Sequence, residues 1–125
     1  MVTPPEPMQM AGPGQMVSLA ALHEIVSRQF GDLVKAVVDV EKGTMVIGGE
    51  LHADEEAFLL DIGSRQSDLW GINLYPAQYG ELDWLEFDSM INLRPSQGNR
   101  SRSVEDPTIR HQITEIVAQL VRNDG

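Results

Sequence analysis

The sequence predicts an α+β fold: a four-stranded, mostly antiparallel sheet of two hairpins, with an N-terminal and a C-terminal helix packed on one face. Three observations lead to this prediction. Apolar residues recur at helical spacing near both ends of the chain, period-two patterns lie between them, and turn signals divide those patterns into two hairpins. A chain of 125 residues without an internal repeat is expected to form one domain.

Composition narrows the classes of function. The chain has a net charge of −10 and no cysteine. The negative charge argues against binding to nucleic acid or to an anionic membrane, because both attract positive charge. The lack of cysteine excludes disulfides, thiolate zinc sites and cysteine nucleophiles. No apolar run approaches the ~18–20 residues of a membrane-spanning helix. We therefore expect a soluble, cytoplasmic protein, and no motif in it predicts a cofactor.

Residues 1–16 predict a disordered tail. Three prolines occur within the first seven residues, and Gly12-Pro13-Gly14 follows. Such a composition buries too little apolar surface to fold alone. The segment has no cationic start and no continuous apolar core, so it does not resemble a signal peptide. The single domain is then expected over residues 17–125.

The first helix is expected over residues 19–30, between Ser18 as N-cap and Gly31 as a stop. Its apolar stripe consists of Leu19, Leu22, Val26 and Phe30. The helix is amphipathic, with one face for the core.

The first hairpin follows this helix. Alternating residues predict a strand over residues 33–40, Lys42-Gly43 predicts a tight turn, and Met45–Ile47 begins the returning strand. Gly48-Gly49 indicates a bulge, after which the strand is expected to resume over residues 50–53.

Residues 54–63 favour a short helix, because Asp54 can cap its start and Gly63 can follow its last turn. A strand through residues 57–61 is the alternative.

The second hairpin is expected to pair residues 68–75 with a long strand over residues 81–93. Pro76–Gly80 forms the turn between them, and Pro95 ends the second strand because it cannot donate to a ladder.

The last helix begins at Asp106-Pro107, an acidic N-cap followed by a proline at the first helical position. Its apolar stripe consists of Ile109, Ile113, Ile116, Val117 and Leu120.

Four segments resemble a small bacterial family of unknown function: VVDVEKG (37–43), GGELHAD (48–54), GSRQSDLWG (63–71) and INLRPSQGNRS (91–101). The resemblance covers about residues 33–122. It implies a single cytoplasmic domain, and it implies no catalytic residue, cofactor or substrate.

The fourth predicted strand has a polar face, because side chains two residues apart share a face. That face would carry Trp84, Glu86, Asp88, Met90, Asn92 and Arg94. If Glu50, His52 and Asp54 lie on the same face of the sheet, carboxylates, an imidazole, an amide and a guanidinium meet in one patch.

The polar segment that follows the strand is a candidate anion site. Arg94, Gln97, Asn99 and Arg100 could cradle a carboxylate or phosphate, since the arginine fork matches both groups. The structural alternative is that Arg94 pairs with a carboxylate of its own strand, Glu86 or Asp88, while the amides satisfy loop backbone groups.

Three classes of function therefore stay open. The first is a binding module for a small polar or anionic ligand or for a protein partner. It would use the anion-site residues, with His52, Trp70 and Asn92 lining the patch, although Trp70 could instead pack against Trp84 across the strands. The second is a metal-assisted hydrolase in which Glu50, His52 and Asp54 hold the metal and Asp68 or Glu86 is the base. The third is a homo-oligomer that pairs through an exposed sheet face or edge.

Overall fold

The computed structural model describes residues 2–29 and 31–123. Within them lies a five-stranded antiparallel sheet in the order β1-β4-β3-β5-β6, and a separate parallel pair of β2 with β7. The strands are β1 Gln9–Ala11, β2 Val17–Ser18, β3 Val34–Asp39, β4 Thr44–Ile47, β5 Leu69–Leu74, β6 Leu85–Glu86 and β7 Val121–Arg122. The α-helices are α1 Leu19–Arg28, α2 His52–Asp61 and α3 Pro107–Leu120.

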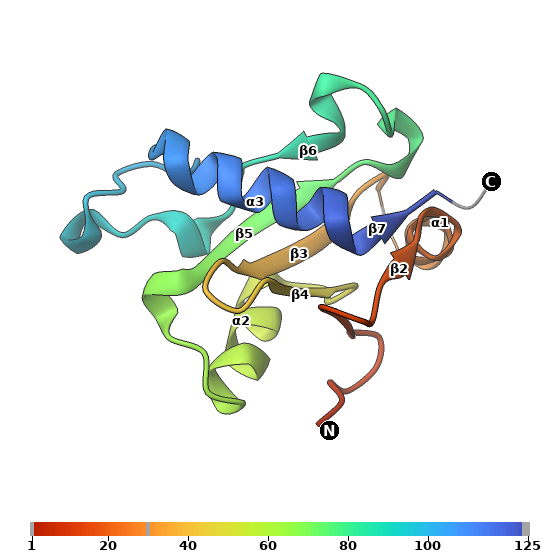
Figure 1. Cartoon of the computed structure of the whole chain (residues 1–125), viewed down its shortest axis with the longest axis horizontal. Coiled ribbons are helices and arrows are strands. Elements are labelled where there is room, and N and C mark those ends of the chain that lie inside the picture. Colours follow the sequence, from red (N-terminus) through yellow and green to blue (C-terminus); the bar gives the residue numbers. More distant parts are fainter. Residues whose placement is uncertain (1, 30, 124–125) are drawn as a thin grey trace.

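The two terminal helices pack against one face of the sheet, as the sequence predicted. Ala36, Val38 and Ile72 project from this face into a cluster that also contains Leu22 of α1 and Ile113 of α3. Figure 1 shows α3 lying across β3 and β5, with α1 beside the β2–β7 pair.

The opposite face is partly covered by α2. Val37, Val46 and Leu69 project from it and pack with Phe58 and Leu59 of α2 in a second cluster. Because α2 is only ten residues long, it leaves the end of this face near its first residue uncovered. The structure therefore has helices on both faces of the sheet.

The predicted caps of the terminal helices are confirmed. The Ser18 hydroxyl accepts from the Ala21 backbone N–H at 3.1 Å at the start of α1. The Asp106 carboxylate accepts from the Thr108 N–H at 2.8 Å at the start of α3, with Pro107 in the first helical position. Phe30, the last residue of the predicted first helix, lies outside the described residues.

The N-terminal segment departs from the prediction of a disordered tail over residues 1–16. Gln9–Ala11 pair with β4 in antiparallel register, and Ala11 is buried. The three prolines precede this strand and so do not interrupt its ladder. Composition pointed to disorder, but a strand this short needs only the edge that β4 already provides.

The second strand does not resume after its glycines. It ends at Ile47, Gly48 turns the chain with φ of 86°, and α2 begins at His52. The expected strand over residues 50–53 is therefore wrong. The preference for a helix over residues 54–63 is correct in type, but the helix starts two residues earlier, and Leu51 rather than Asp54 is its N-cap.

The fourth strand is much shorter than the predicted residues 81–93. Only Leu85–Glu86 pair with β5, and Met90–Asn92 form a 3-10 turn. Beyond β6 the edge of β5 is occupied by a side chain, because Asn92 bonds to the backbone of Gly71. The alternating polar face expected along this strand is consequently not formed.

Candidate functional site

Arg94, the first residue of the predicted anion site, is bound by backbone carbonyl groups. Its Nε donates to Ile91 O at 2.9 Å, its Nη1 to Gln66 O at 2.7 Å, and its Nη2 to Leu69 O. The guanidinium lies 4.4 Å from the centre of the Trp70 ring, and burial lowers the pKa of Arg94. With 7% of the residue exposed, little of this cation is left for a ligand.

Asn99 is likewise committed to the backbone. Its Nδ2 donates to Asn92 O and Ser103 O, both at 2.7 Å, and to Ser101 O at 3.1 Å. Its Oδ1 accepts from Glu105 N at 2.9 Å. The amide therefore holds together the loop that leads to α3.

The two other residues of the predicted anion site are exposed. The Gln97 Oε1 accepts from Arg94 at 3.2 Å, and the backbone N–H of Arg100 donates to Glu105 Oε2 at 3.0 Å. These contacts favour the structural alternative. Its partners differ from those expected, because carbonyl oxygens bind Arg94 while Asp88 pairs with Arg102 at 2.7 Å.

The predicted metal ligands do not converge. Glu50 lies exposed before α2 and Asp54 lies exposed on it, whereas the His52 Nε2 bonds to Ile72 O at 2.8 Å. Over residues 2–29 and 31–123, no group of three or more such side chains is placed to hold a metal ion. Asp68, one of the two candidate bases, pairs with Arg65 at 3.1 Å.

His52 instead lines a cavity of about 510 Å³ at the uncovered end of the sheet face, which we call the Asn73 pocket. Its polar side chains come from β3, α2, β5, β6 and the loops beside them. They are Lys35, His52, Asn73, Tyr75, Glu86, Asp88, Ser89 and Arg102. Of the polar patch considered from sequence, His52, Glu86 and Asp88 do meet here.

Two other members of that patch lie elsewhere, in the structural contacts described above: Asn92 at the edge of β5, and Arg94 against Trp70. Trp70 faces the cluster under the terminal helices, and Trp84 packs edge-to-face with Tyr79, at 4.9 Å between ring centres, rather than with Trp70.

Asn73 forms the buried wall of the pocket, with 6% of the residue exposed. Its Nδ2 donates to Glu86 Oε1 at 2.9 Å and to Asp88 O at 3.1 Å. The same Glu86 oxygen accepts from the Tyr75 hydroxyl at 3.0 Å. Among the described residues, no donor has the geometry to form a hydrogen bond with the buried Asn73 Oδ1, although the Asn73 side chain lies close enough to His52 to raise its pKa. An unsatisfied buried oxygen is costly unless another molecule supplies a donor.

The pocket also contains a cation without a close counter-ion. Lys35 projects from β3 and forms no ion pair within 4 Å among the residues that the structure describes. Its charge acts on His52, whose pKa is lowered, mainly by burial and further by Lys35. The hydrogen bond to Ile72, the Asn73 side chain and the charge of Asp88 oppose this shift only in part. His52 is therefore neutral at neutral pH.

The start of α2 adds a further preference for negative charge. Leu51, His52 and Ala53 line the pocket, and the N-cap Leu51 supplies no side-chain acceptor to the first N–H groups of the helix. Helix starts favour anions through these groups. Burial and the hydrogen bond to Glu86 raise the pKa of Tyr75 to about 12, so its hydroxyl stays a donor. The pocket thus combines a cation, Lys35, with the acceptors of Asn73 and Glu86 on the neighbouring strands.

Sequence reasoning missed Lys35, Asn73, Tyr75 and Arg102 as members of one site. A signal existed for two of them, since Lys35 and Asn73 are polar residues that interrupt the apolar strand patterns VKAVVD and LWGINL. Tyr75 and Arg102 stand outside the strands, where no periodicity marks them.

Fold and pocket together define a small mixed α/β domain with a polar cavity at one end of its sheet. The chain belongs to the family described as "Protein of unknown function (DUF5674)", which matches residues 14–120. This confirms the resemblance seen in the sequence and extends it toward the N-terminus. No curated protein and no solved structure matches the chain. In the described residues, no helix is both long and apolar enough to span a membrane.

Proposed function

We propose that this protein is a binding module for a small polar molecule, held in the Asn73 pocket. The molecule would carry an anionic group, such as a carboxylate or phosphate, and at least one N–H or O–H donor. The observation that carries this proposal is the buried, unpartnered Asn73 Oδ1 on the wall of a cavity of about 510 Å³.

The donor of the ligand follows from the acceptors of the pocket. Within the described residues Asn73 Oδ1 has no hydrogen-bond partner, and it is the Oε1 of Glu86 that accepts from Asn73 and Tyr75. An amino or hydroxyl group placed between these acceptors would satisfy a buried oxygen that otherwise destabilises the fold.

The anionic group follows from Lys35 and the start of α2. Lys35 forms no ion pair within 4 Å in the part of the chain that the structure describes. The first residues of α2 lie at the same cavity. A carboxylate or phosphate there would gain a charge-assisted hydrogen bond. The cavity volume also lies within the ~300–1,000 Å³ that is usual for small-molecule pockets.

The test is a binding screen in which NMR chemical shifts report binding at individual residues. Lactate, glycerate, L-serine and glycerol 3-phosphate are titrated into the full-length ¹⁵N-labelled chain, with glycerol as the uncharged control. We expect a binder to shift the Asn73 side-chain amide and the Lys35 and His52 backbone amides, and glycerol to bind more weakly. Shifts confined to other residues would count against the pocket.

A variant pair separates charge from packing. Lys35→Met should weaken binding of the charged compounds by about tenfold or more, the effect of one lost charge-assisted contact. Lys42→Met removes an exposed lysine from the β3–β4 turn and should leave binding unchanged. Equal binding by both variants would refute the assignment of Lys35 to the anion.

A further inference from the structure

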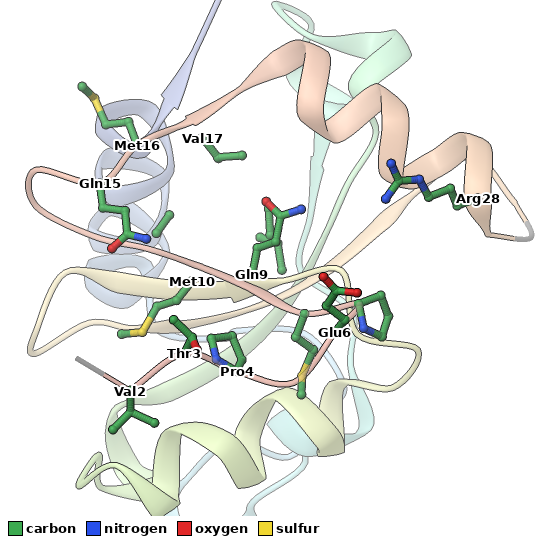
Figure 2. A pocket seen from close by; sticks show the side chains of 14 residues that line it. Val2, Thr3, Pro4, Glu6, Gln9, Met10, Gln15, Met16, Val17 and Arg28 are labelled. Atoms are coloured by element: carbon green, nitrogen blue, oxygen red, sulfur yellow. The ribbon is translucent and has the colours of Figure 1, made fainter.

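A second cavity, of about 600 Å³, lies beside the outer edge of β1. Figure 2 shows its lining side chains: Val2, Thr3 and Pro4 on one side, Gln15 and Met16 on another, and Arg28 of α1 beyond Glu6. The cavity is bounded by the N-terminal arm, by α1 and by the chain that returns toward β2.

The register of the sheet decides which backbone groups of β1 face this cavity. Gly48 N donates to Lys35 O at 3.2 Å, so the backbone of Gly48 faces β3. Backbone groups two residues apart point the same way in an antiparallel ladder, so Val46 also faces β3. Met45 and Ile47 therefore face β1, where Ala11 and Gln9 are their partners.

Met10 lies opposite Val46 and must direct its N–H and C=O away from β4, to the outer edge. The backbone groups of Met8 and Gly12, two positions to either side of Met10, also point to the outer edge. Gly12 exchanges two hydrogen bonds with Gln15, at 2.9 and 2.8 Å, and the Met8 N–H donates to Pro5 O at 3.1 Å.

One rung of the outer edge is thus left open. Turns close the edge on both sides of Met10, but no described group outside the sheet bonds to the N–H or the C=O of Met10. The gap has a structural cause. After Gln15 the chain leaves β1, because Val17–Ser18 pair in parallel with β7 instead.

We propose that this open rung is a binding site for an extended peptide segment of another protein, which adds to β1 as a short antiparallel strand. A peptide residue supplies the matching donor and acceptor together, as in other cases where a strand adds to a sheet edge. This site is separate from the Asn73 pocket and does not depend on it.

The side chains around the rung suit a variable partner. Met8, Met10 and Met16 line the cavity, and methionine adapts its shape to different apolar groups. Main-chain bonds to Met10 would then provide affinity while the pocket accepts alternate side chains of the peptide.

A second copy of this chain fits the site less well. The three-residue β1 edge is flanked by the Pro5–Met8 turn and by the Gly12–Gln15 hairpin, which stand in the way of a second sheet edge. A single extended segment can enter between them.

The first test measures the free protein. By amide hydrogen exchange, the Met10 N–H should exchange about tenfold or more faster than those of Gln9 and Ala11, because only the latter are in the ladder. Equal protection of all three amides would show that the rung is closed and would overturn the proposal.

The second test identifies the occupant. A displayed library of random heptapeptides is selected on the full-length protein, and enriched peptides are resynthesised with single N-methyl groups. We expect binding that an N-methyl group at one position of the peptide abolishes. If no peptide is enriched, or if no N-methyl group weakens binding, strand addition does not occur here.

A variant pair locates the contact. Met10→Pro removes the outward N–H but none of the β1–β4 bonds, a substitution that edge strands tolerate. Met10→Ala removes the side chain and keeps the N–H. Met10→Pro should weaken peptide binding about tenfold relative to Met10→Ala, with circular dichroism confirming that both fold. Equal peptide binding by the two variants would contradict the peptide proposal. So would a dimer, detected by light scattering, that dissociates in Met10→Pro. If Met10→Pro does not fold, the N-methyl peptides still test whether the peptide binds through its backbone.

Discussion

Asn92 completes the edge of β5 by pairing its side-chain amide with the backbone of Gly71. Its Oδ1 accepts from Gly71 N at 2.8 Å and its Nδ2 donates to Gly71 O at 2.9 Å. These are the two bonds that a neighbouring strand would make. The side chain therefore takes over where β6 ends, and it also donates to Arg102 O at 3.0 Å.

Removing this amide should destabilise the domain. Asn92→Ala leaves the N–H and C=O of the buried Gly71 without partners, whereas the C=O of Arg102 keeps its bond from Ser89 N. We expect the free energy of unfolding to fall by about 2–4 kcal/mol, measured by urea denaturation. Gln112→Ala, on the exposed face of α3, should change it by no more than about 0.5 kcal/mol; similar losses in both variants would argue against a special role for Asn92.

Gly71 is required by the close approach of the chain that carries Asn92. A Cβ at Gly71 would lie 2.6 Å from both Cβ and Oγ of Ser89 and 3.1 Å from Cγ1 of Ile91. Gly71→Ala should therefore lower the free energy of unfolding by about 2–3 kcal/mol through overpacking.

A double-mutant cycle checks this cause. Ser89→Gly removes both atoms at 2.6 Å, so Gly71→Ala should be less destabilising in that background. Additive effects would show that the clash with Ser89 is not the reason for the loss.

The parts of the fold with local signals could be predicted from sequence. Ser18, the Lys42-Gly43 turn and Asp106-Pro107 each act on their own neighbours in the chain, and the helices and the hairpin that they mark are found. The two edge strands β1 and β6 could not be predicted in their observed extent. Each has two or three residues and exists because a neighbouring strand offers an edge.

The contacts of the candidate site were also only partly predictable from sequence. The high content of arginine and amide groups after β6 suggested an anion, yet Arg94 and Asn99 bind carbonyl oxygens, and every residue of the chain carries such an oxygen. Sequence patterns therefore do not reveal these partners. The pocket, by contrast, unites Lys35 and Asn73 with Arg102 through the pairing of β3 with β5 and the path of the loop.

Arg94 and Arg100 should behave differently despite their proximity in sequence. Arg94→Ala removes the side-chain donor from the carbonyl groups of Ile91 and Leu69 and exposes the face of Trp70, while Gln66 O keeps its bond from Leu69 N. We therefore expect a loss of about 2–4 kcal/mol. Arg94→Lys should recover little, because an ammonium cannot reproduce the planar fork.

Arg100→Ala serves as the matched control, since its side chain is exposed and its hydrogen bond to Glu105 uses the backbone N–H. Its melting temperature should stay close to that of the unchanged protein. A stable Arg94→Ala variant that had lost ligand binding would instead restore the predicted anion site.

Glu55 should make the domain less stable as pH rises. Burial raises the pKa of this carboxyl well above its ordinary value of 4.5, and the N–H of Gly49 and the charge of Lys35 oppose the shift only in part. Between the unfolded and the folded pKa the native state binds more protons than the unfolded state. The free energy of unfolding therefore decreases from about pH 4.5 up to the folded pKa.

Glu55→Gln keeps an acceptor for Gly49 and cannot ionise, so it should remove this decline and stabilise the domain at neutral pH. Urea denaturation from pH 4 to pH 8 compares the two proteins, with the exposed Asp83→Asn as a control for net charge. A parallel pH dependence of Glu55→Gln and the unchanged protein would show that Glu55 ionises as freely in the folded state as in the unfolded one.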